Sequence, residues 1–404
     1  MGKPKIRFKG FDNDWEHRKL NEITDVRDGT HDSPKYVQEG HPFITSKNVS
    51  NGFINYDDVQ YVTDEDYEEI NKRSKVDVHD ILMGMIGTIG NLALIRKEPD
   101  FAIKNVALIK YTGDIEYKYL YQALQADCVT SQLSTGMDGG TQKFVSLKKI
   151  RELDIPFPEE CEQKKIGAYF SNLDTLITLH QRKCEDTKKL KKYMLQKMFP
   201  QNGSKVPEIR FKGFTDDWEQ RKLGDLAEIV GGGTPSTSID LYWDGELDWY
   251  APAEIGDQIY LESSQRKITE EGLNKSSAKM LPVGTVLFTS RAGIGKTAIL
   301  QKEGCTNQGF QSIVPNKVKL DSYFIFTRSE ELKRYGETVG AGSTFVEVSG
   351  KQMANMELMM PMTMQEQQKI GAYFSKLDNL ITLHQNKCDE LKKIKKYMLQ
   401  NMFV

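Results

Sequence analysis

The strongest constraint on the fold is a long sequence that the chain carries twice. The segment KIGAYFSNLDTLITLHQRKC begins at Lys165, and KIGAYFSKLDNLITLHQNKC begins at Lys369. A comparison of residues 163–200 with residues 367–404, without a gap, gives 28 identical residues in 38 positions. Two near-identical segments must therefore find a place in any fold of this chain.

A second repeated motif opens each half, IRFKGFDNDWEHRKL from Ile6 and IRFKGFTDDWEQRKL from Ile209. The two repeats have nearly equal offsets (209 − 6 = 203 and 369 − 165 = 204), so one whole unit is copied once. Residues 24–145 and 230–345, between the repeated motifs, share almost no run of sequence. We expect these two middle regions to share a fold while their surfaces differ.

The repeated segment is predicted to be a long helix. Pro158 and Pro361 precede it, and proline suits a helix start but not its interior. Acidic residues fill the first turn of each copy and lysines gather near its far end, as the helix dipole favours. At about 1.5 Å per residue, a helix of this kind would be roughly 60 Å long.

Apolar residues recur at helical spacing along each copy and form one stripe on a charged rod. Two such stripes in one chain suggest that the helices pair with each other, and a two-fold relation between the halves makes the pair antiparallel. A metal site between His180 and His384 is an alternative to two interface histidines. The predicted pairing residues are Leu173, Ile177, His180, Cys184, Leu190, Met194, Leu377, Ile381, His384, Cys388, Leu391 and Met398.

The middle regions read as mixed α/β (α+β) domains. In the first, short β-branched and aromatic runs such as DILMGMI, NLALIR and VALIKY predict strands, and DYEEINKRSK and YKYLYQALQADCVTSQL predict helices. In the second, ELDWYAPAEI, GTVLFTS, TAILQ and QSIVP predict strands, and DSYFIFTRSEELKRYG predicts a helix. Each region is thus expected to fold as its own globular domain.

Composition narrows the class of protein. The 404 residues carry a formal net charge of −2, whereas a free-standing DNA-binding domain is usually basic. Five scattered cysteines without a C-x-x-C pair favour a reducing cytoplasm. The longest apolar run, ILMGMIGTIGNLALI, is too short and glycine-rich for a membrane span, and the N-terminal segment has no apolar signal region.

Two enzymatic interpretations fail on their motifs. RAGIGKT at residues 291–297 looks like a phosphate-binding loop, but Ser290 stands where the pattern needs glycine. A tight turn between strands or a DNA-facing turn explains it better. A methyltransferase would need an Asn/Asp-Pro-Pro-aromatic motif or a G-x-G-x-x-G after a strand, and the sequence has neither. No H-E-x-x-H, C-x-x-C or G-x-S-x-G occurs either, so we expect no catalytic or metal site.

Polar, glycine-bearing loops recur at corresponding places in the two middle regions. RDGTHDSPKY matches VGGGTPSTSI in position, SKNV matches APAEI, AIKNVAL matches CTNQGFQSI, and GGTQKF matches GAGSTF. Glycine lets a backbone approach a ligand, and side chains of this kind read base edges and phosphates. Solvated loops with no ligand are the plain alternative.

Taken together, the sequence resembles the DNA specificity (S) subunit of a type I restriction–modification system. The resemblance covers the whole chain and rests on the order of head motif, variable middle and helix, repeated once. It also rests on GGGTPS, GTVLFTSRAGIGK, NQGFQSI and the EQQKIGAYFSKLD entry to the helix. Singly these motifs are weak, and together they are specific.

The resemblance implies target recognition domains at 1–158 and 201–361 and spacer helices at 159–200 and 362–404, which form an antiparallel coiled coil. Each domain would read one half of a bipartite, asymmetric site in double-stranded DNA. The helices would set the spacer and dock two modification (methyltransferase) subunits, through which restriction subunits join. The chain itself would be non-catalytic, with S-adenosylmethionine, Mg and ATP on the partners. These partners could also neutralise most of the DNA phosphates, which would explain the acidic pI.

The loops then supply the candidate DNA contacts. In the first domain these are Thr30, His31, Lys35, Ser46, Lys47, Asn48, Thr88, Asn91, Lys104, Asn105, Gln142 and Lys143. In the second they are Thr234, Ser236, Thr237, Ser290, Arg291, Lys296, Asn307, Gln308, Ser343 and Thr344. Two rival classes remain: a nuclease or methyltransferase fusion, and a protein–protein scaffold without DNA contact.

Overall fold

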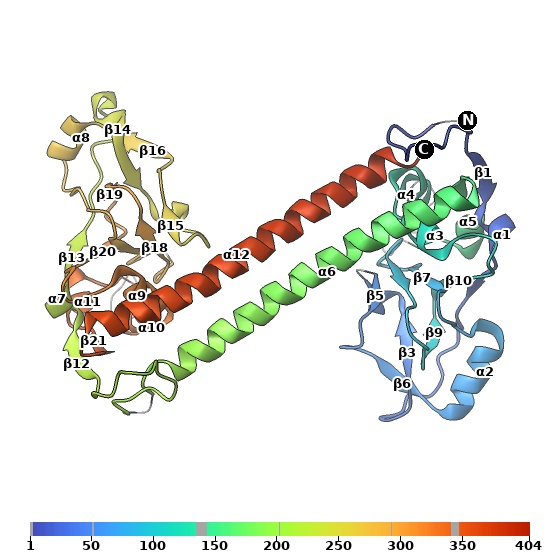
Figure 1. Cartoon of the computed structure of the whole chain (residues 1–404), viewed down its shortest axis with the longest axis horizontal. Coiled ribbons are helices and arrows are strands. Elements are labelled where there is room, and N and C mark those ends of the chain that lie inside the picture. Colours follow the sequence, from blue (N-terminus) through green and yellow to red (C-terminus); the bar gives the residue numbers. More distant parts are fainter. Residues whose placement is uncertain (1–2, 51, 135–143, 202, 292, 341–346) are drawn as a thin grey trace. The chain divides into compact units, whose positions relative to one another are not determined.

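The computed structural model describes residues 3–50, 52–134, 144–201, 203–291, 293–340 and 347–404. The chain divides into two compact units. Unit 1 comprises Met1–Gln181 and Gln385–Val404, and unit 2 comprises Arg182–His384. Each unit therefore holds one middle region, the first part of one long helix and the last part of the other (Figure 1).

The elements of the first half alternate strands and short helices before the first long helix. They are β1 (Glu16–Lys19), α1 (Leu20–Ile23), β2 (Val26–Asp28), β3 (His41–Thr45), η1 (Ser46–Asn48), β4 (Val49–Ser50), β5 (Phe53–Ile54), β6 (Gln60–Val62), α2 (Asp64–Ser74), β7 (Ile81–Gly84), β8 (Leu92–Leu94), β9 (Ala102–Lys104), β10 (Val106–Ile109), α3 (Tyr117–Ala123), α4 (Asp127–Ser134), α5 (Leu147–Arg151), β11 (Asp154–Phe157) and α6 (Glu160–Lys197).

The second half follows the same plan. Its elements are β12 (Glu219–Lys222), α7 (Leu223–Leu226), β13 (Ala227–Gly231), η2 (Asp240–Tyr242), β14 (Trp243–Tyr250), η3 (Pro252–Glu254), β15 (Tyr260–Leu261), β16 (Arg266–Ile268), α8 (Glu270–Asn274), β17 (Val286–Phe288), β18 (Thr297–Leu300), β19 (Cys305–Thr306), β20 (Gln311–Pro315), α9 (Ser322–Thr327), α10 (Ser329–Gly340), α11 (Gly350–Ala354), β21 (Glu357–Met360) and α12 (Met364–Asn401).

The sheets of the two units correspond. Among the described residues, unit 1 has a sheet in the order β2-β10-β7-β8, and unit 2 has one in the order β13-β20-β17-β18-β15. A second sheet in each unit contains one parallel pair, β3 with β9 and β14 with β19. The head motif closes each unit, since β1 pairs with β11 and β12 pairs with β21. The predicted α/β (α+β) class is confirmed. Each of the two segments predicted as one helix, YKYLYQALQADCVTSQL and DSYFIFTRSEELKRYG, is divided into two helices, α3 with α4 and α9 with α10, and the end of the predicted strand ELDWYAPAEI is η3.

The main core of each unit forms between its sheet and its helices. In unit 1, α3, α4 and α5 lie beside the start of α6 (Figure 1), and Tyr119, Leu120 and Phe170 are fully or almost fully buried there. The same cluster takes in Met402 and Phe403 from the end of α12. Unit 2 mirrors this, because its core includes Met198 and Phe199 from the end of α6 together with Phe374 from the start of α12.

Candidate nucleic-acid interface

Each head motif is fixed to the start of a long helix by a buried carboxylate. In unit 1, Arg7 donates from Nε and Nη2 to the two oxygens of Glu162, each at 2.8 Å, and Trp15 Nε1 donates to Glu162 Oε2 at 3.0 Å. Glu162 is fully buried. The hydrogen bonds to the Glu162 carboxylate raise the pKa of Arg7. A bidentate, desolvated pair of this kind holds a precise geometry.

Unit 2 repeats this arrangement, which we call the helix clamp. Arg210 donates from Nε and Nη2 to Glu366 at 2.7 and 2.9 Å, and Trp218 Nε1 donates to Glu366 Oε1 at 3.4 Å. The backbone entry is repeated too, with Ile6 N–H donating to Asn401 O in unit 1 and Ile209 N–H donating to Lys197 O in unit 2. The clamp thus sets where each long helix begins against its domain.

The long helices pack antiparallel within each unit. In unit 2, Lys191 Nζ lies 2.6 Å from Asp378 Oδ1. Just beyond the end of α6 the ring of Phe199 packs on Phe374, at 6.1 Å between centroids. The partner residue number falls as the α6 number rises, which defines an antiparallel pair.

Unit 1 holds the repeat image of these contacts. Lys395 Nζ lies 2.8 Å from Asp174 Oδ1, and Phe403 packs on Phe170 at 5.9 Å. Both aspartates are further bonded, Asp174 by Gln122 Nε2 and Asp378 by the hydroxyl of Tyr323. The predicted antiparallel pairing of the helices is confirmed by these contacts.

Most predicted pairing residues lie on the seam between the helices. Leu173, Ile177, Cys184, Leu377, Cys388 and Leu391 are buried. The half-buried residues are His180, Met194, Ile381, His384 and Met398. Cys184 Sγ lies 3.8 Å from Ile381 O. In the described part of the chain, no group of three or more His, Cys, Asp or Glu residues is arranged to hold a metal ion.

Leu190 is the exception, and its assignment to the seam was wrong. Its side chain is 44% exposed. Leu190 follows Cys184 by six residues, which rotates it by about 120° around a helix of 3.6 residues per turn. Lys191, seven residues after Cys184, is the residue that reaches the seam, where it pairs with Asp378.

Leu190 instead belongs to a second apolar stripe on the solvent side of each helix. Unit 1 exposes Leu176, Leu179, Ile394 and Tyr397, and unit 2 exposes Leu190, Tyr193, Leu380 and Leu383, each between 37% and 60%. The four positions on α6 are the repeat equivalents of the four on α12. In an antiparallel pair, residues turned by the same angle from a shared seam project to the same side. Each unit therefore has one apolar patch shared by both helices, which we call the outer apolar patch.

The predicted loops of unit 1 come together at the end of β9. Thr30 N–H donates to Ile103 O at 3.1 Å. The next residue, His31, has Nδ1 at 2.7 Å from Asn105 Oδ1 and Nε2 at 2.9 Å from Asp28 Oδ2. The contacts with Asn105 and Asp28 raise the pKa of His31. The result is an imidazole held to the sheet by both of its ring nitrogens.

The neighbouring candidates of unit 1 lie around this point. Lys104 Nζ donates to Ser33 Oγ, and Lys47 Nζ pairs with Asp58 at 2.7 Å. Thr88 Oγ1 donates to Ser46 O at 2.5 Å, and Asn91 Nδ2 donates to Val49 O at 3.3 Å. Thr30, Lys47, Thr88, Asn91 and Lys104 are at least partly exposed. Lys35 is an exposed residue of the same loop as His31.

Unit 2 brings its loops together in the same backbone arrangement. Gly233 N–H donates to Thr306 O at 2.8 Å, as Thr30 does to Ile103. The next residue, Thr234, donates from its hydroxyl to Gln308 Oε1. The turn after β17 also matches, since Thr289 N–H donates to Lys296 O as Gly84 N–H does to Asn91 O. Equivalent backbone sites thus carry unlike side chains.

The other unit 2 candidates surround this site. Arg291 is half-exposed, and its Nη1 lies 4.0 Å from Glu347 Oε2. Asn307 Oδ1 accepts from Gly309 N at 2.7 Å. Ser236 Oγ lies 2.9 Å from Ser238 Oγ, and Thr237 and Lys296 are exposed.

Three candidates are buried and cannot touch DNA directly. Ser46 is 5% exposed, and its hydroxyl donates to Asn105 O while accepting from Met85 N. Asn48 is 3% exposed, and its amide bonds the backbones of Thr45, Asn55 and Asp58. Ser290 is fully buried behind Arg291. Ser46 and Asn48 are therefore corrected to residues that shape the loops, and Ser290 to a core position.

Four candidates, Gln142, Lys143, Ser343 and Thr344, lie outside the described residues. Sequence reasoning missed the groups that position the loops. Asp28 is one, and it bonds both His31 and Arg73. The two tryptophans of β14 are others, because Trp249 Nε1 donates to Gly233 O at 2.8 Å and Trp243 Nε1 donates to Ser236 O at 3.1 Å. Tryptophan in a strand gives no sequence signal for such a contact.

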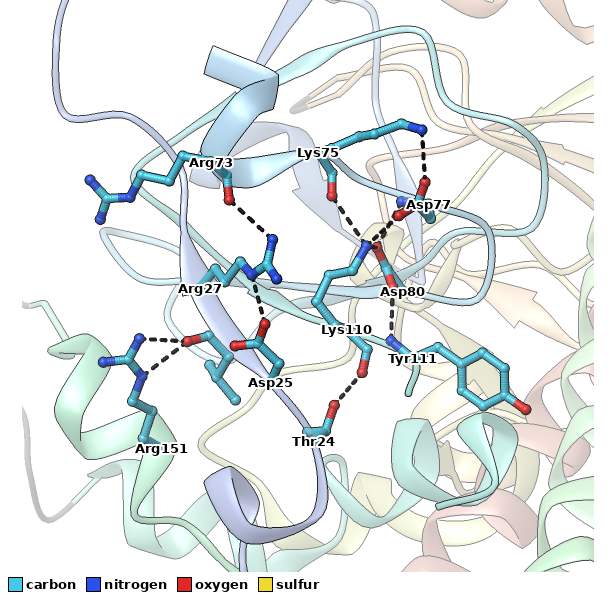
Figure 2. Close-up of polar contacts among 11 residues, drawn as sticks. Thr24, Asp25, Arg27, Arg73, Lys75, Asp77, Asp80, Lys110, Tyr111 and Arg151 are labelled. Carbon is cyan, nitrogen blue, oxygen red and sulfur yellow. Dashed lines mark hydrogen bonds and ion pairs between the residues drawn. The ribbon is translucent and has the colours of Figure 1, made fainter. Parts of the chain in front are cut away.

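Figure 2 shows a second polar network of unit 1, along the edge strand β2. Lys110 Nζ lies 2.6 Å from both Asp77 Oδ2 and Asp80 Oδ2, and it lowers the pKa of Asp77. Arg151 donates from Nε and Nη2 to Val26 O, at 3.0 and 2.7 Å. Arg151 ties α5 to β2, and Lys110 ties the end of β10 to the loop before β7, so we assign the network to the fold.

Comparisons with known proteins agree with this architecture. The family model for the type I restriction modification DNA specificity domain matches the chain twice, over residues 12–188 and 215–393. The chain belongs to this family, and by family and fold it is a specificity subunit of a type I restriction–modification system. Within the described residues, no helix has both the length and the apolar character to cross a membrane.

Relatives of known type are also specificity subunits. The chain is 35% identical to the type I restriction enzyme MjaIX specificity subunit of Methanocaldococcus jannaschii over 46% of its own length and 44% of that relative's. It is 25% identical to the putative MjaX specificity subunit of the same organism over 96% of its own length and 92% of that relative's. These relatives are specificity subunits, not the catalytic subunits of their systems.

A solved structure shows the same fold. The crystal structure of the S subunit of the type I restriction–modification system of M. genitalium matches with a TM-score of 0.69, covering 100% of this chain and 99% of that one. The identity between the two is 15%, so the likeness concerns the fold alone. The predicted architecture of two recognition domains joined by paired helices is therefore the family's fold.

Proposed function

We propose that this chain is the DNA-reading subunit of a type I restriction–modification complex, in which each recognition domain reads one half of a bipartite, asymmetric site. The observation that carries the proposal is the pair of equivalent loop sites. Backbone bonds from Thr30 to Ile103 and from Gly233 to Thr306 fix the same loop position in both units. The following side chains differ, His31 in one and Thr234 in the other. The same backbone arrangement with different side chains is what two domains need to read two half-sites of different sequence.

The paired helices would set the spacer between the half-sites. Lys191–Asp378 in unit 2 and Lys395–Asp174 in unit 1 fix the register of the two helices at both places. A fixed register would give a fixed separation of the reading groups, much as protein geometry sets half-site spacing in other DNA-binding proteins. Helix length would then determine spacer length.

Two modification subunits would dock on the outer apolar patches. Each patch exposes three aliphatic side chains and one tyrosine on the solvent side of a helix pair. Clustered apolar groups of this size on a helix surface are typical of protein interfaces. The duplicated chain offers one such patch in each unit, which matches two identical partners. Restriction subunits would join through these partners.

The chemistry would belong to the partners. S-adenosylmethionine, Mg and ATP are expected on the modification and restriction subunits, and the modification subunits would neutralise most of the DNA phosphates. This division explains how a chain of net charge −2 can serve in a DNA complex. The five cysteines are free thiols, in keeping with the proposed cytoplasmic location.

An exchange of recognition domains tests the proposal. Residues 24–158 are replaced by the corresponding region of another specificity subunit, and the chimera is expressed with the modification subunit of this system. Single-molecule sequencing of the methylated DNA should show one half of the motif changed and the other half retained. A change in both halves, or in neither, would contradict modular reading.

A scaffold without DNA contact remains the second candidate, and the outer apolar patches are the feature that favours it. Binding of the chain with its modification subunit to a random duplex separates the two candidates. A DNA-reading complex loses affinity steeply as salt rises, because each phosphate contact releases counterions. A scaffold shows no such dependence beyond that of the modification subunit alone.

A further inference from the structure

The two reading loops share a contact that goes beyond their common backbone. In unit 1 the loop residue His31 donates from Nδ1 to the side-chain carbonyl of Asn105, at 2.7 Å. In unit 2 the equivalent residue, Thr234, donates from Oγ1 to the side-chain carbonyl of Gln308. Asn105 and Gln308 are equivalent as well, since each stands two residues after the strand residue that accepts the loop backbone bond, Ile103 or Thr306.

His31 and Thr234 are chemically unrelated, yet each donates a hydrogen bond to a side-chain amide oxygen. A threonine hydroxyl and an imidazole N–H have in common only that they can donate a hydrogen bond. Within the described part of the chain, the NH2 groups of Asn105 and Gln308 donate no hydrogen bond. Gln308 is exposed and Asn105 is half-buried, and the Asn105 amide is not among the buried unpaired atoms. The NH2 groups therefore face solvent while the carbonyls are occupied.

The backbone around each amide holds it in place. Asn105 adopts a φ of +52°, and its own carbonyl accepts from the buried Ser46 hydroxyl at 2.7 Å. In unit 2 the loop beside Gln308 is pinned by both tryptophans of β14 through their indole N–H groups. A rigid amide loses little conformational entropy when it binds, which suits a group that discriminates between bases.

From this geometry we propose that Asn105 and Gln308 are the specificity-determining donors of their half-sites, each presenting only its NH2 group to a base edge in the major groove. This proposal rests on the proposed DNA-reading function. A free amide normally reads adenine by two bonds, one donated to N7 and one accepted from N6. The bond from His31 or Thr234 takes one of the two lone pairs of the carbonyl oxygen and orients the amide, which then meets a base edge through its NH2 group.

An NH2 group that only donates hydrogen bonds selects a base by the acceptors on its major-groove edge. Guanine offers N7 and O6, and thymine offers O4. Cytosine presents only a donor in the major groove and is rejected. Adenine loses the advantage of the second bond, because its N6 donor then has no acceptor. Each half-site should therefore contain one position, opposite Asn105 or Gln308, where guanine or thymine is preferred over adenine and cytosine.

The test uses the full chain with its modification subunit and reads the methylated motif and the affinity for duplexes that carry it. Gln308→Glu keeps the acceptor for Thr234 and removes the donors. It should weaken binding by at least about 10-fold, within the range of roughly 1–3 kcal/mol for a base contact, and relax one position of the second half-site. The first half-site should not change. Asn105→Asp should do the same for the first half-site only.

Substitutions of Thr234 separate the proposed role from a structural one. Thr234→Val frees the carbonyl of Gln308 and should extend the reading at the same position to adenine. Thr234→Ser keeps the donor and should keep the original motif. An unchanged motif for both Gln308→Glu and Thr234→Val would overturn the inference, as would a motif for Thr234→Ser that shifts like that of Thr234→Val. A wild-type complex that methylates no bipartite motif would instead refute the proposed function.

Discussion

Removing the carboxylate of one helix clamp should destabilise one unit strongly. In unit 1 the guanidinium of Arg7 is 12% exposed and pairs with the fully buried Glu162. Glu162→Ala would leave that cation without its carboxylate and would leave the indole N–H of Trp15 without its acceptor. Loss of one partner from a buried ion pair costs about 3–5 kcal/mol. We therefore expect the free energy of unfolding of unit 1 to fall by about 4 kcal/mol, a Tm decrease of roughly 8–16 °C at about 2–4 °C per kcal/mol for a unit of this size.

Tryptophan fluorescence can follow this unit alone. The chain has tryptophan at positions 15, 218, 243 and 249, so Trp15 is the single tryptophan of unit 1. Urea unfolding monitored at Trp15 would report unit 1, with Trp218, Trp243 and Trp249 substituted by phenylalanine in both the reference and the variant. This background gives the comparison a matched reference, since both proteins carry the same three substitutions.

The duplicated clamp supplies the control. Glu366→Ala, followed at Trp218 in a chain whose other three tryptophans are phenylalanine, makes the same change in unit 2, where Trp218 Nε1 is 3.4 Å from the carboxylate instead of 3.0 Å. We expect a similar cost there, slightly smaller because the indole bond is longer. The double variant Arg7→Leu/Glu162→Leu should recover most of the loss, because no charge is left buried. A cost below about 1 kcal/mol for Glu162→Ala, or a double variant no better than the single one, would refute the reasoning.

Three further predictions follow from the helices and loops. Lys191→Ala and Lys395→Ala should lower the free energy of unfolding by similar amounts, about 1–2 kcal/mol each, since each lysine pairs with a partly or largely buried aspartate. Lys72→Ala, which removes an exposed pair with Glu69, should leave the urea unfolding curve unchanged. The pKa of His31 is raised in the fold, so the contribution of His31 to stability is fully present below about pH 6.5 and is lost as pH rises through the higher folded pKa. Unfolding measured from about pH 5 to pH 8 should show this loss of stability. His31→Ala has no titrating group at this position, so the variant should lack this pH dependence. Leu179→Glu and Leu383→Glu should weaken copurification with the modification subunit by at least about 10-fold. The Tm of the free chain should not change, because both side chains are exposed, whereas Leu391→Glu should lower the Tm because Leu391 is buried. Normal copurification of the two exposed-site variants would exclude the outer apolar patch as the docking surface.

The sequence carried enough information for the architecture because its main signals are local or repeated. A copied segment with one apolar stripe predicts a paired helix without knowledge of any contact, and β-branched runs beside glycine turns predict the strands of both sheets. The assignment of Leu190 to the seam was wrong because apolar character alone does not fix angular position. The side chain of Lys191 reaches the seam instead, since its Nζ has a carboxylate partner there.

The candidate site was predicted less completely, for a different physical reason. Polarity in a loop does not distinguish a side chain that faces a ligand from one that supports the backbone. Ser46 and Asn48 are as polar as Thr30, yet both are buried and form hydrogen bonds with the backbone of their own domain. The helix clamps were missed because Arg7 and Glu162 are 155 residues apart in the sequence, a separation at which no spacing rule applies.

The cross-copy ion pairs have a consequence for how this gene can change. Each pair joins a lysine of one helix to an aspartate of the other, so the two copies of the helix serve as each other's binding partner. A substitution at Asp174 would leave Lys395 without its carboxylate, and a compensating change would have to arise at Lys395, far away in the coding sequence. The reading loops described above are instead held by side chains of their own unit. Mutual dependence of this kind would keep the helices alike long after the surfaces that read DNA had drifted apart.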